Sequence, residues 1–219
     1  MIPAVFTYDF PERCIALLDA LESPARNTFL PAHGETGPLI TTFAISMAMP
    51  LIIVPIERLG TYRNASKQDR AHLPQMYERV KRELMKPFGQ TCFRGNGRWS
   101  LATTPHIVRA PADWASAIDQ VEGLFAPRHR QALDNLSGSE VLNGLRHALA
   151  HGSIAYLDEA GRWEPGQEAK IVAFIATDRT GHGPDGSNIF CVSQEDLLLF
   201  LRAWAGFLMD AGRDEHLVL

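Results

Sequence analysis

One helix is encoded in residues 137–152, Ser137-Gly-Ser-Glu-Val-Leu-Asn-Gly-Leu-Arg-His-Ala-Leu-Ala-His-Gly152. This segment contains its start signal, its hydrophobic periodicity and its stop signal. Ser137 and Glu140 have the spacing of a capping box, in which each side chain accepts a hydrogen bond from a free backbone N–H of the first turn. Gly152 stands where a residue of left-handed conformation commonly ends a helix. The stretch therefore predicts a helix over 137–152.

The two faces of this predicted helix differ in their chemistry. At about 100° per residue, one face gathers the apolar residues Leu142, Leu145, Ala148 and Leu149. The opposite face gathers Asn143, Arg146, His147, Ala150 and His151. A guanidinium is a planar fork that suits phosphate oxygens, and an imidazole gives or takes a proton near neutral pH. We therefore expect this face to hold a phosphate and to move protons.

Arg146 and His151 are the candidate catalytic residues, with His147 and Asn143 as supporting or substrate-binding residues. Five positions place Arg146 and His151 about 140° apart around the helix axis, so they bracket one face. Two such helices, paired antiparallel across a twofold axis, would bring both sets into one cleft, and this predicts a homodimer. His151 lies in the last turn, where the helix dipole favours an imidazolium that can protonate a leaving oxygen. Cleavage of RNA by its own 2′-hydroxyl requires a group that holds the phosphate and a group that protonates the leaving oxygen, and it needs no metal.

The stretch Arg146-His147-Ala-Leu-Ala-His151-Gly152 resembles the R-x(4–6)-H motif of HEPN domains (higher eukaryotes and prokaryotes nucleotide-binding). The apolar terminal helix and the strands before it are also similar to HEPN proteins of bacteria and plasmids. The resemblance implies a HEPN-like helical bundle, a dimer with the motif at its interface, and a metal-independent endoribonuclease that uses no cofactor. It places Arg146 and His151 at the family's catalytic positions and His147 at a variable polar position, where Asn is expected most often.

The same resemblance implies a setting and partners. HEPN ribonucleases often act in toxin–antitoxin or phage-defence systems. The implied partners are therefore an RNA substrate, a second copy of the chain and an antitoxin or regulatory protein. The alternative function is a non-catalytic module that binds nucleotides or RNA, or recognises a partner, because a fold by itself does not establish an activity.

Simpler interpretations of the motif residues stay open. Arg146 also fits a surface arginine beside an acidic neighbour, and His151 fits a C-terminal residue that hydrogen-bonds the last carbonyls of its helix. His147 and His151 have the i, i+4 spacing of metal ligands. A zinc site needs at least a third protein ligand, and the candidates, His33, His182 and Asp185, lie in loops without a motif. The sequence therefore predicts no metal site.

The rest of the chain predicts a mainly α protein with one domain over residues 1–219 and a small C-terminal β-hairpin or sheet. Further helices are expected at 11–22, at 39–59, at 112–125, and from Ser193 to Gly212. Another is expected from a cap at Ser66 and Asp69 to about Met85, interrupted or delayed by Pro74. Residues 89–111 are irregular and predict a short strand or an insertion. Strands are expected at 154–157, 170–177 and 188–192, within a hairpin region over 153–192.

The overall composition argues against binding along a nucleic-acid duplex and allows a local anion site. The 219 residues are 46% hydrophobic and 21% charged, with a formal net charge of −4, which argues against a basic footprint for a whole nucleic-acid duplex. A local anion site is compatible with this charge, because the field of a cleft depends on a few neighbours. The three cysteines are far apart and lack C-x-x-C spacing, which favours a reducing, cytoplasmic location.

Residues 39–56 contain no charged side chain over a length at the lower limit for a membrane span. Pro50 and Pro55 lie inside this stretch, and Glu57 and Arg58 follow it directly. We expect a helix buried in a soluble core and bent near Pro50, with a membrane-associated segment as the alternative. The N-terminal residues lack the basic and apolar regions of a secretory signal.

Overall fold

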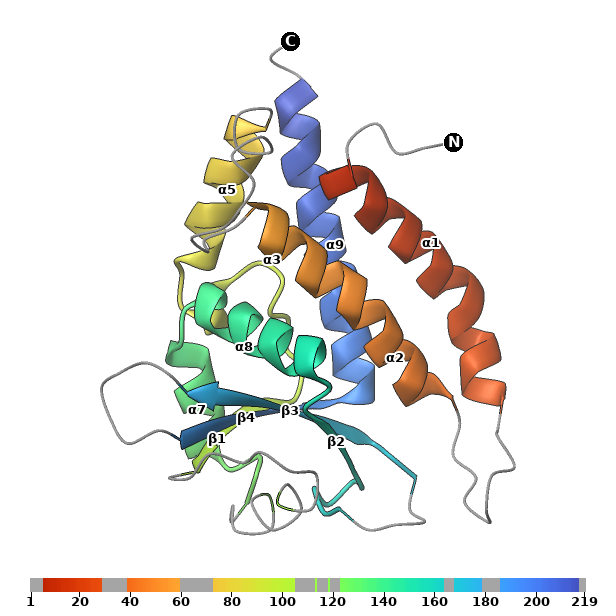
Figure 1. Cartoon of the computed structure of the whole chain (residues 1–219), viewed down its shortest axis with the longest axis vertical. Coiled ribbons are helices and arrows are strands. Elements are labelled where there is room, and N and C mark those ends of the chain that lie inside the picture. Colours follow the sequence, from red (N-terminus) through yellow and green to blue (C-terminus); the bar gives the residue numbers. More distant parts are fainter. Residues whose placement is uncertain are drawn as a thin grey trace.

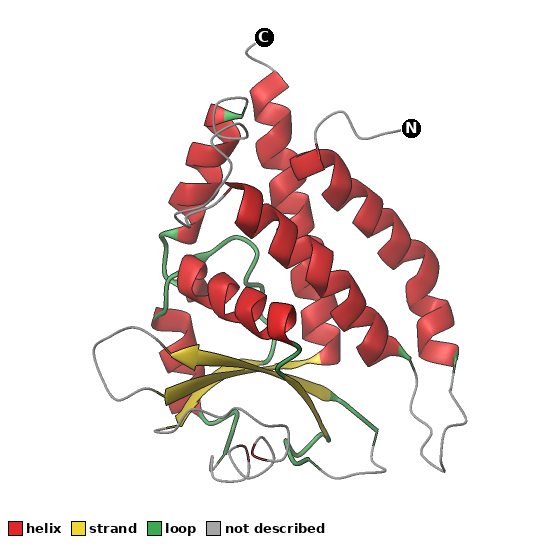
Figure 2. Ribbon diagram, in the orientation of Figure 1, coloured by secondary structure: helices red, strands yellow, loops and turns green. Residues whose placement is uncertain are grey.

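The described part of the chain is mainly helical, with one small antiparallel sheet (Figures 1 and 2). This computed structural model describes residues 6–28, 39–59, 73–104, 113, 118, 123–163, 168–178 and 186–216. The helical elements are α1 (Phe6–Asn27), α2 (Ile40–Ala48), η1 (Met49–Ile53), α3 (Val54–Leu59), α5 (Pro74–Leu84), η2 (Phe88–Gln90), α7 (Pro127–Asn135), α8 (Gly138–His151) and α9 (Gln194–His216). The strands are β1 (Trp99–Thr104), β2 (Ile154–Leu157), β3 (Ile171–Asp178) and β4 (Gly186–Ser193).

The sheet has four antiparallel strands in the order β1-β4-β3-β2. Its three C-terminal strands lie close to where the sequence predicts them. β1 comes from the irregular segment 89–111, and it pairs with β4 from Trp99↔Val192 to Thr104↔Ser187. The prediction of a short strand there is confirmed for residues 99–104, and the alternative of an insertion stays a prediction. Residues 105–111 lie outside the described part of the chain.

The two faces of the sheet pack against different material, as strand alternation requires. Val172, Phe174, Phe190 and Val192 join the main core with the helices. Ala173, Ile175, Ile189 and Cys191 point to the other face and form a second cluster with Leu124. The helix predicted over 112–125 falls mostly outside the described residues, so its extent is not described.

Helix α8 forms as the sequence predicts and lies across the helix-covered face of the sheet (Figure 1). The Glu140 backbone N–H donates to Ser137 Oγ at 3.1 Å, and the Ser137 backbone N–H donates to Glu140 Oε2 at 2.7 Å. Gly152 ends the helix with φ at 65°, in the left-handed region. The apolar face is fully buried, which fixes the rotation of the helix and turns the motif residues away from the core.

The apolar stretch from Ile40 to Leu59 forms one long helical segment, with a π-helical turn at Met49–Ile53. Pro50 has no N–H for the α-helical hydrogen-bond ladder, which accounts for the widened turn. Pro55 also lacks the N–H that the Leu51 carbonyl would accept, and Trp204 Nε1 of α9 donates to that carbonyl at 2.7 Å. This segment is long and apolar enough to cross a membrane, but 56% of its most apolar window is buried inside the protein. The burial supports a core helix.

The first, third and last predicted helices have different bounds in the structure. α1 is longer than expected, and Pro11 lies inside it and not in its first turn. The described part of the third helix begins at Pro74, and its predicted cap at Ser66 and Asp69 lies outside the described residues. α9 begins at the predicted Ser193–Asp196 cap, where the Asp196 backbone N–H donates to Ser193 Oγ at 3.1 Å. The prediction that α9 ends at Gly212 is wrong, because the helix continues to His216.

Candidate functional site

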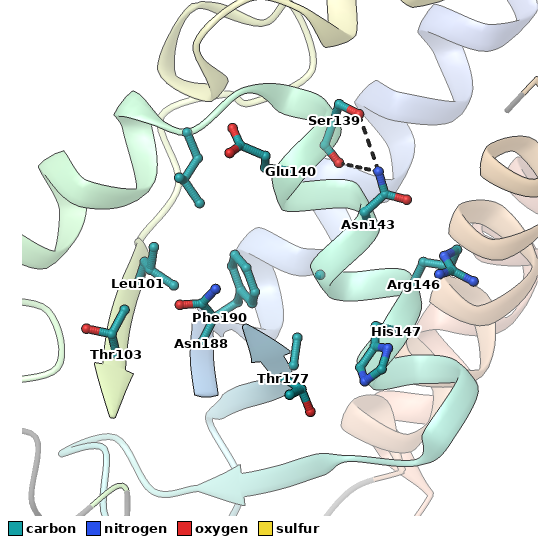
Figure 3. A pocket seen from close by; sticks show the side chains of 13 residues that line it. Leu101, Thr103, Ser139, Glu140, Asn143, Arg146, His147, Thr177, Asn188 and Phe190 are labelled. Carbon is teal, nitrogen blue, oxygen red and sulfur yellow. Dashed lines mark hydrogen bonds between the residues drawn. The ribbon is translucent and has the colours of Figure 1, made fainter. Parts of the chain in front are cut away.

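A pocket of about 500 Å³ opens between α8 and the sheet (Figure 3). Its α8 wall carries Ser139, Glu140, Asn143, Gly144, Arg146 and His147. Its sheet wall carries Leu101, Thr103, Ala176, Thr177, Asn188 and Phe190, and Leu136, which follows α7, completes the lining. The motif face predicted from the sequence therefore borders a cavity, and α8 positions it by burying the opposite face in the core.

Arg146 borders the pocket, and its guanidinium is turned away from the sheet toward α3, where an acidic residue holds it (Figure 3). Its Nη1 donates to Glu57 Oε1 of α3 at 2.6 Å. The Arg146 side chain is 19% exposed and that of Glu57 is 49% exposed. This partner matches the alternative of an arginine beside an acidic neighbour. It is also compatible with phosphate binding, because an anion from solvent can reach an ion pair that is open on the Glu57 side.

The two histidines of the motif contact each other. The rings of His147 and His151 lie with their centroids 4.6 Å apart and their planes inclined by 53°. His147 lines the pocket, whereas His151 is exposed and lies outside its lining. Two neighbouring imidazoles can supply one proton donor and one acceptor. The pair is therefore suited to proton transfer at the end of the pocket.

Backbone groups satisfy two of the last carbonyls of α8. The Ser153 backbone N–H donates to the Ala148 carbonyl at 2.9 Å, and the Gly152 N–H donates to the Leu149 carbonyl at 3.4 Å. Ending the helix in this way needs no side chain at His151. The structure thus weakens the interpretation of His151 as a cap.

Asn143 lies one turn before Arg146 on the pocket wall, and its own helix fixes its side chain (Figure 3). Its Nδ2 donates to the Ser139 carbonyl at 2.9 Å and to Ser139 Oγ at 3.3 Å. Its Oδ1 is buried and accepts no hydrogen bond from the described residues. A rigid amide at this place can orient its neighbours in the pocket.

The structure brings Asn143, Arg146 and His147 together on one wall and leaves His151 beside His147. It also adds residues that the sequence did not indicate, namely Glu57 and the strand residues Thr103, Thr177 and Asn188. These residues come from four separate elements. Only the register of the sheet brings the three strand residues together, so no local motif announces them.

The described residues hold no group of three or more His, Cys, Asp or Glu side chains placed for a metal ion. The further metal-ligand candidates His33, His182 and Asp185 lie outside those residues. His147 and His151 are neighbours, but the described structure supplies them with no third ligand. The metal alternative therefore gains no support from the described site.

No family model matches this chain, and searches of the curated proteins and of the solved structures found no match. The resemblance to HEPN domains therefore depends on the residues of α8 and on the elements that follow it.

Proposed function

We propose that this protein is a metal-independent endoribonuclease of the HEPN type, with a HEPN-like helical bundle, that acts as a homodimer. The observation that carries the proposal is the arrangement of α8. This helix presents a guanidinium and the His147 imidazole at the wall of a pocket that is large enough for a nucleotide, with the His151 ring next to that of His147. The order of elements after α8, three strands and a long apolar helix, supports the same class.

In this proposal Arg146 binds the scissile phosphate by exchanging the Glu57 carboxylate for phosphate oxygens. The 2′-hydroxyl of the preceding ribose attacks phosphorus, and the bond from phosphorus to the 5′ oxygen breaks. A proton leaves the attacking hydroxyl and another reaches the leaving oxygen, with His151 as acid/base or charge stabiliser. His147 and Asn143 orient these groups or the substrate. The products are a 2′,3′-cyclic phosphate and a 5′-hydroxyl.

The homodimer is part of the proposal because one α8 leaves the motif face incomplete. His151 is exposed and stands outside the pocket lining. A second α8 packed across a twofold axis would add its own arginine and histidines to the same cleft.

We place the protein in the cytoplasm, which agrees with free thiols at Cys14, Cys92 and Cys191. There it would act as a toxin or phage-defence effector controlled by an antitoxin or regulatory protein.

The test is RNA cleavage by the purified protein in the presence of EDTA, with mass spectrometry of the RNA ends. Wild-type protein is expected to leave 2′,3′-cyclic phosphates. Arg146→Ala and His151→Ala are each expected to lower the rate at least about a hundredfold, as loss of an acid/base or charge-stabilising group does. Arg82→Ala, which removes an exposed arginine of α5, is the matched control and should cleave normally.

Unchanged cleavage in both motif variants would refute the assignment of these residues. A non-catalytic module that binds nucleotides or RNA, or recognises a partner, is the second candidate, and the position of His151 outside the pocket lining favours it. RNA binding without cleavage, at the same affinity in wild type and His151→Ala, would establish the binding module in place of the enzyme.

A further inference from the structure

The sheet side and the α8 side of the pocket differ in their chemistry (Figure 3). Leu101 and Phe190 provide apolar surface on the sheet, whereas Arg146 and His147 provide cationic and proton-transferring groups on α8. A nucleotide is divided in the same way, because a flat base with apolar faces is joined through a sugar to an anionic phosphate. The volume of about 500 Å³ falls within the range of small-ligand sites.

Asn188 supplies groups that can recognise the edge of a base. It is half buried on β4, directly opposite Thr103 of β1 and Ala176 of β3, and all three residues line the pocket. A carboxamide offers two N–H donors and one carbonyl acceptor, and such amides commonly pair with base edges. Because β4 is hydrogen-bonded to strands on both sides, a rigid strand carries this amide.

Phe190 gives the pocket a fixed floor. Its side chain is only 2% exposed, and its ring lies directly against α8 at Gly144. A Cβ on Gly144 would lie 2.5 Å from Phe190 Cε2, so the glycine is what allows this close approach. The floor is therefore part of the core, and a ligand would contact it without displacing it.

We infer that the pocket is a nucleobase subsite. It holds the base of the nucleotide whose phosphate Arg146 binds, and Asn188 determines which base is accepted. The inference deepens the proposed ribonuclease function and rests on it for the phosphate position. Asn188 is accordingly a specificity-determining residue.

The test is calorimetric titration of the full chain with the four nucleoside 3′-monophosphates and with inorganic phosphate. At least one nucleotide is expected to bind about tenfold or more tightly than phosphate, as one hydrogen bond and partial apolar burial would provide. Asn188→Ala should remove the differences between bases. Thr103→Trp, at an exposed pocket position on an edge strand, should block the base and leave the affinity of phosphate unchanged.

The control is Asn135→Ala, which removes an exposed amide at the end of α7 outside the pocket and should change nothing. Wild-type protein that binds all nucleotides no more tightly than phosphate would overturn the subsite, as would base discrimination that persists in both pocket variants. Base-selective binding by a protein that cuts no RNA would refute the ribonuclease and retain the subsite. Cleavage with the same base preference in wild type and both pocket variants would refute the subsite and retain the ribonuclease.

Discussion

The Glu57 carboxylate lies on the guanidinium that the proposed reaction needs for phosphate. The pair is half open to solvent, so it adds at most about 1 kcal/mol to stability. Its larger effect is on binding, because a phosphate must displace the carboxylate before it reaches Arg146. We therefore expect Glu57→Gln to tighten RNA binding about threefold to tenfold, equivalent to removing a weak competing ion pair. Fluorescence anisotropy with a non-cleavable RNA measures this.

Glu78→Gln removes an exposed carboxylate on α5 and is the matched control for general charge effects. It should change RNA affinity much less than Glu57→Gln. Weaker RNA binding by Glu57→Gln would instead show that the carboxylate orients Arg146 for the substrate.

Gly144 and Gly206 form a matched pair of glycines inside helices. A Cβ on Gly144 would lie 2.5 Å from the Phe190 ring, whereas a Cβ on Gly206 would meet nothing within 4 Å. Alanine is favoured over glycine in a helix by about 1 kcal/mol, and overpacking a core costs about 1–3 kcal/mol. Gly206→Ala should therefore stabilise the protein, and Gly144→Ala should destabilise it by about 1 kcal/mol. Urea unfolding of both variants tests this, and equal stabilisation of both would contradict the close approach.

At the scale of elements, Glu83 fastens the end of α5 to the loop that follows it. Lys86 Nζ donates to Glu83 Oε2 at 2.6 Å, and the Cys92 backbone N–H donates to Oε1 at 2.7 Å. Burial by itself raises the pKa of the Glu83 carboxyl, but these hydrogen bonds outweigh it, and the net pKa is lower than the ordinary 4.5. The ionised group therefore stabilises the fold above pH 4.5, and this stabilisation is lost as the pH falls through the lowered pKa.

This linkage predicts how a variant responds to pH. Glu83→Gln should be less stable than wild type at neutral pH, and the difference should shrink as the pH falls below 4.5. Thermal unfolding across that range measures the difference, and carboxyl groups common to both proteins cancel. Glu140→Gln cannot serve as the control variant for this comparison. Glu140 is exposed, and its carboxylate caps α8, so its loss would itself change stability. A gap between wild type and Glu83→Gln that does not change with pH would contradict the pKa direction.

Elements with local signals could be predicted from the sequence, and elements that depend on pairing could not. Helix α8 has a cap, a period and a terminator within sixteen residues, and the structure reproduces all three. β1 has no such signal and becomes a strand because it pairs with β4, whose residues lie about ninety positions later. The pocket depends on that pairing, so the α8 wall was predictable and the sheet wall with Asn188 was not.

At the scale of the whole molecule, distant contacts decide how the motif is presented. The Arg146–Glu57 pair joins residues 89 positions apart, and Trp204 completes the hydrogen bonds of the π-helical turn from 153 positions away. The sequence shows that an arginine and a helix interruption exist, but the fold alone selects their partners. The apolar segment 40–59 illustrates the same limit, since only its burial among α1, α8 and α9 distinguishes a core helix from a membrane span.

The proposed dimer makes a prediction about the whole molecule. If two α8 helices face each other, Ala150, which is exposed next to His151, lies near its own copy. Ala150→Glu would then place two like charges at the axis and raise the dissociation constant of the dimer about tenfold or more. Ala132→Glu, at an exposed position of α7, is the matched control and should leave the dimer intact. Sedimentation equilibrium measures both, and cleavage activity should fall with the dimer fraction. A dimer unaffected by Ala150→Glu, or a fully active monomer, would remove the twofold site from the mechanism.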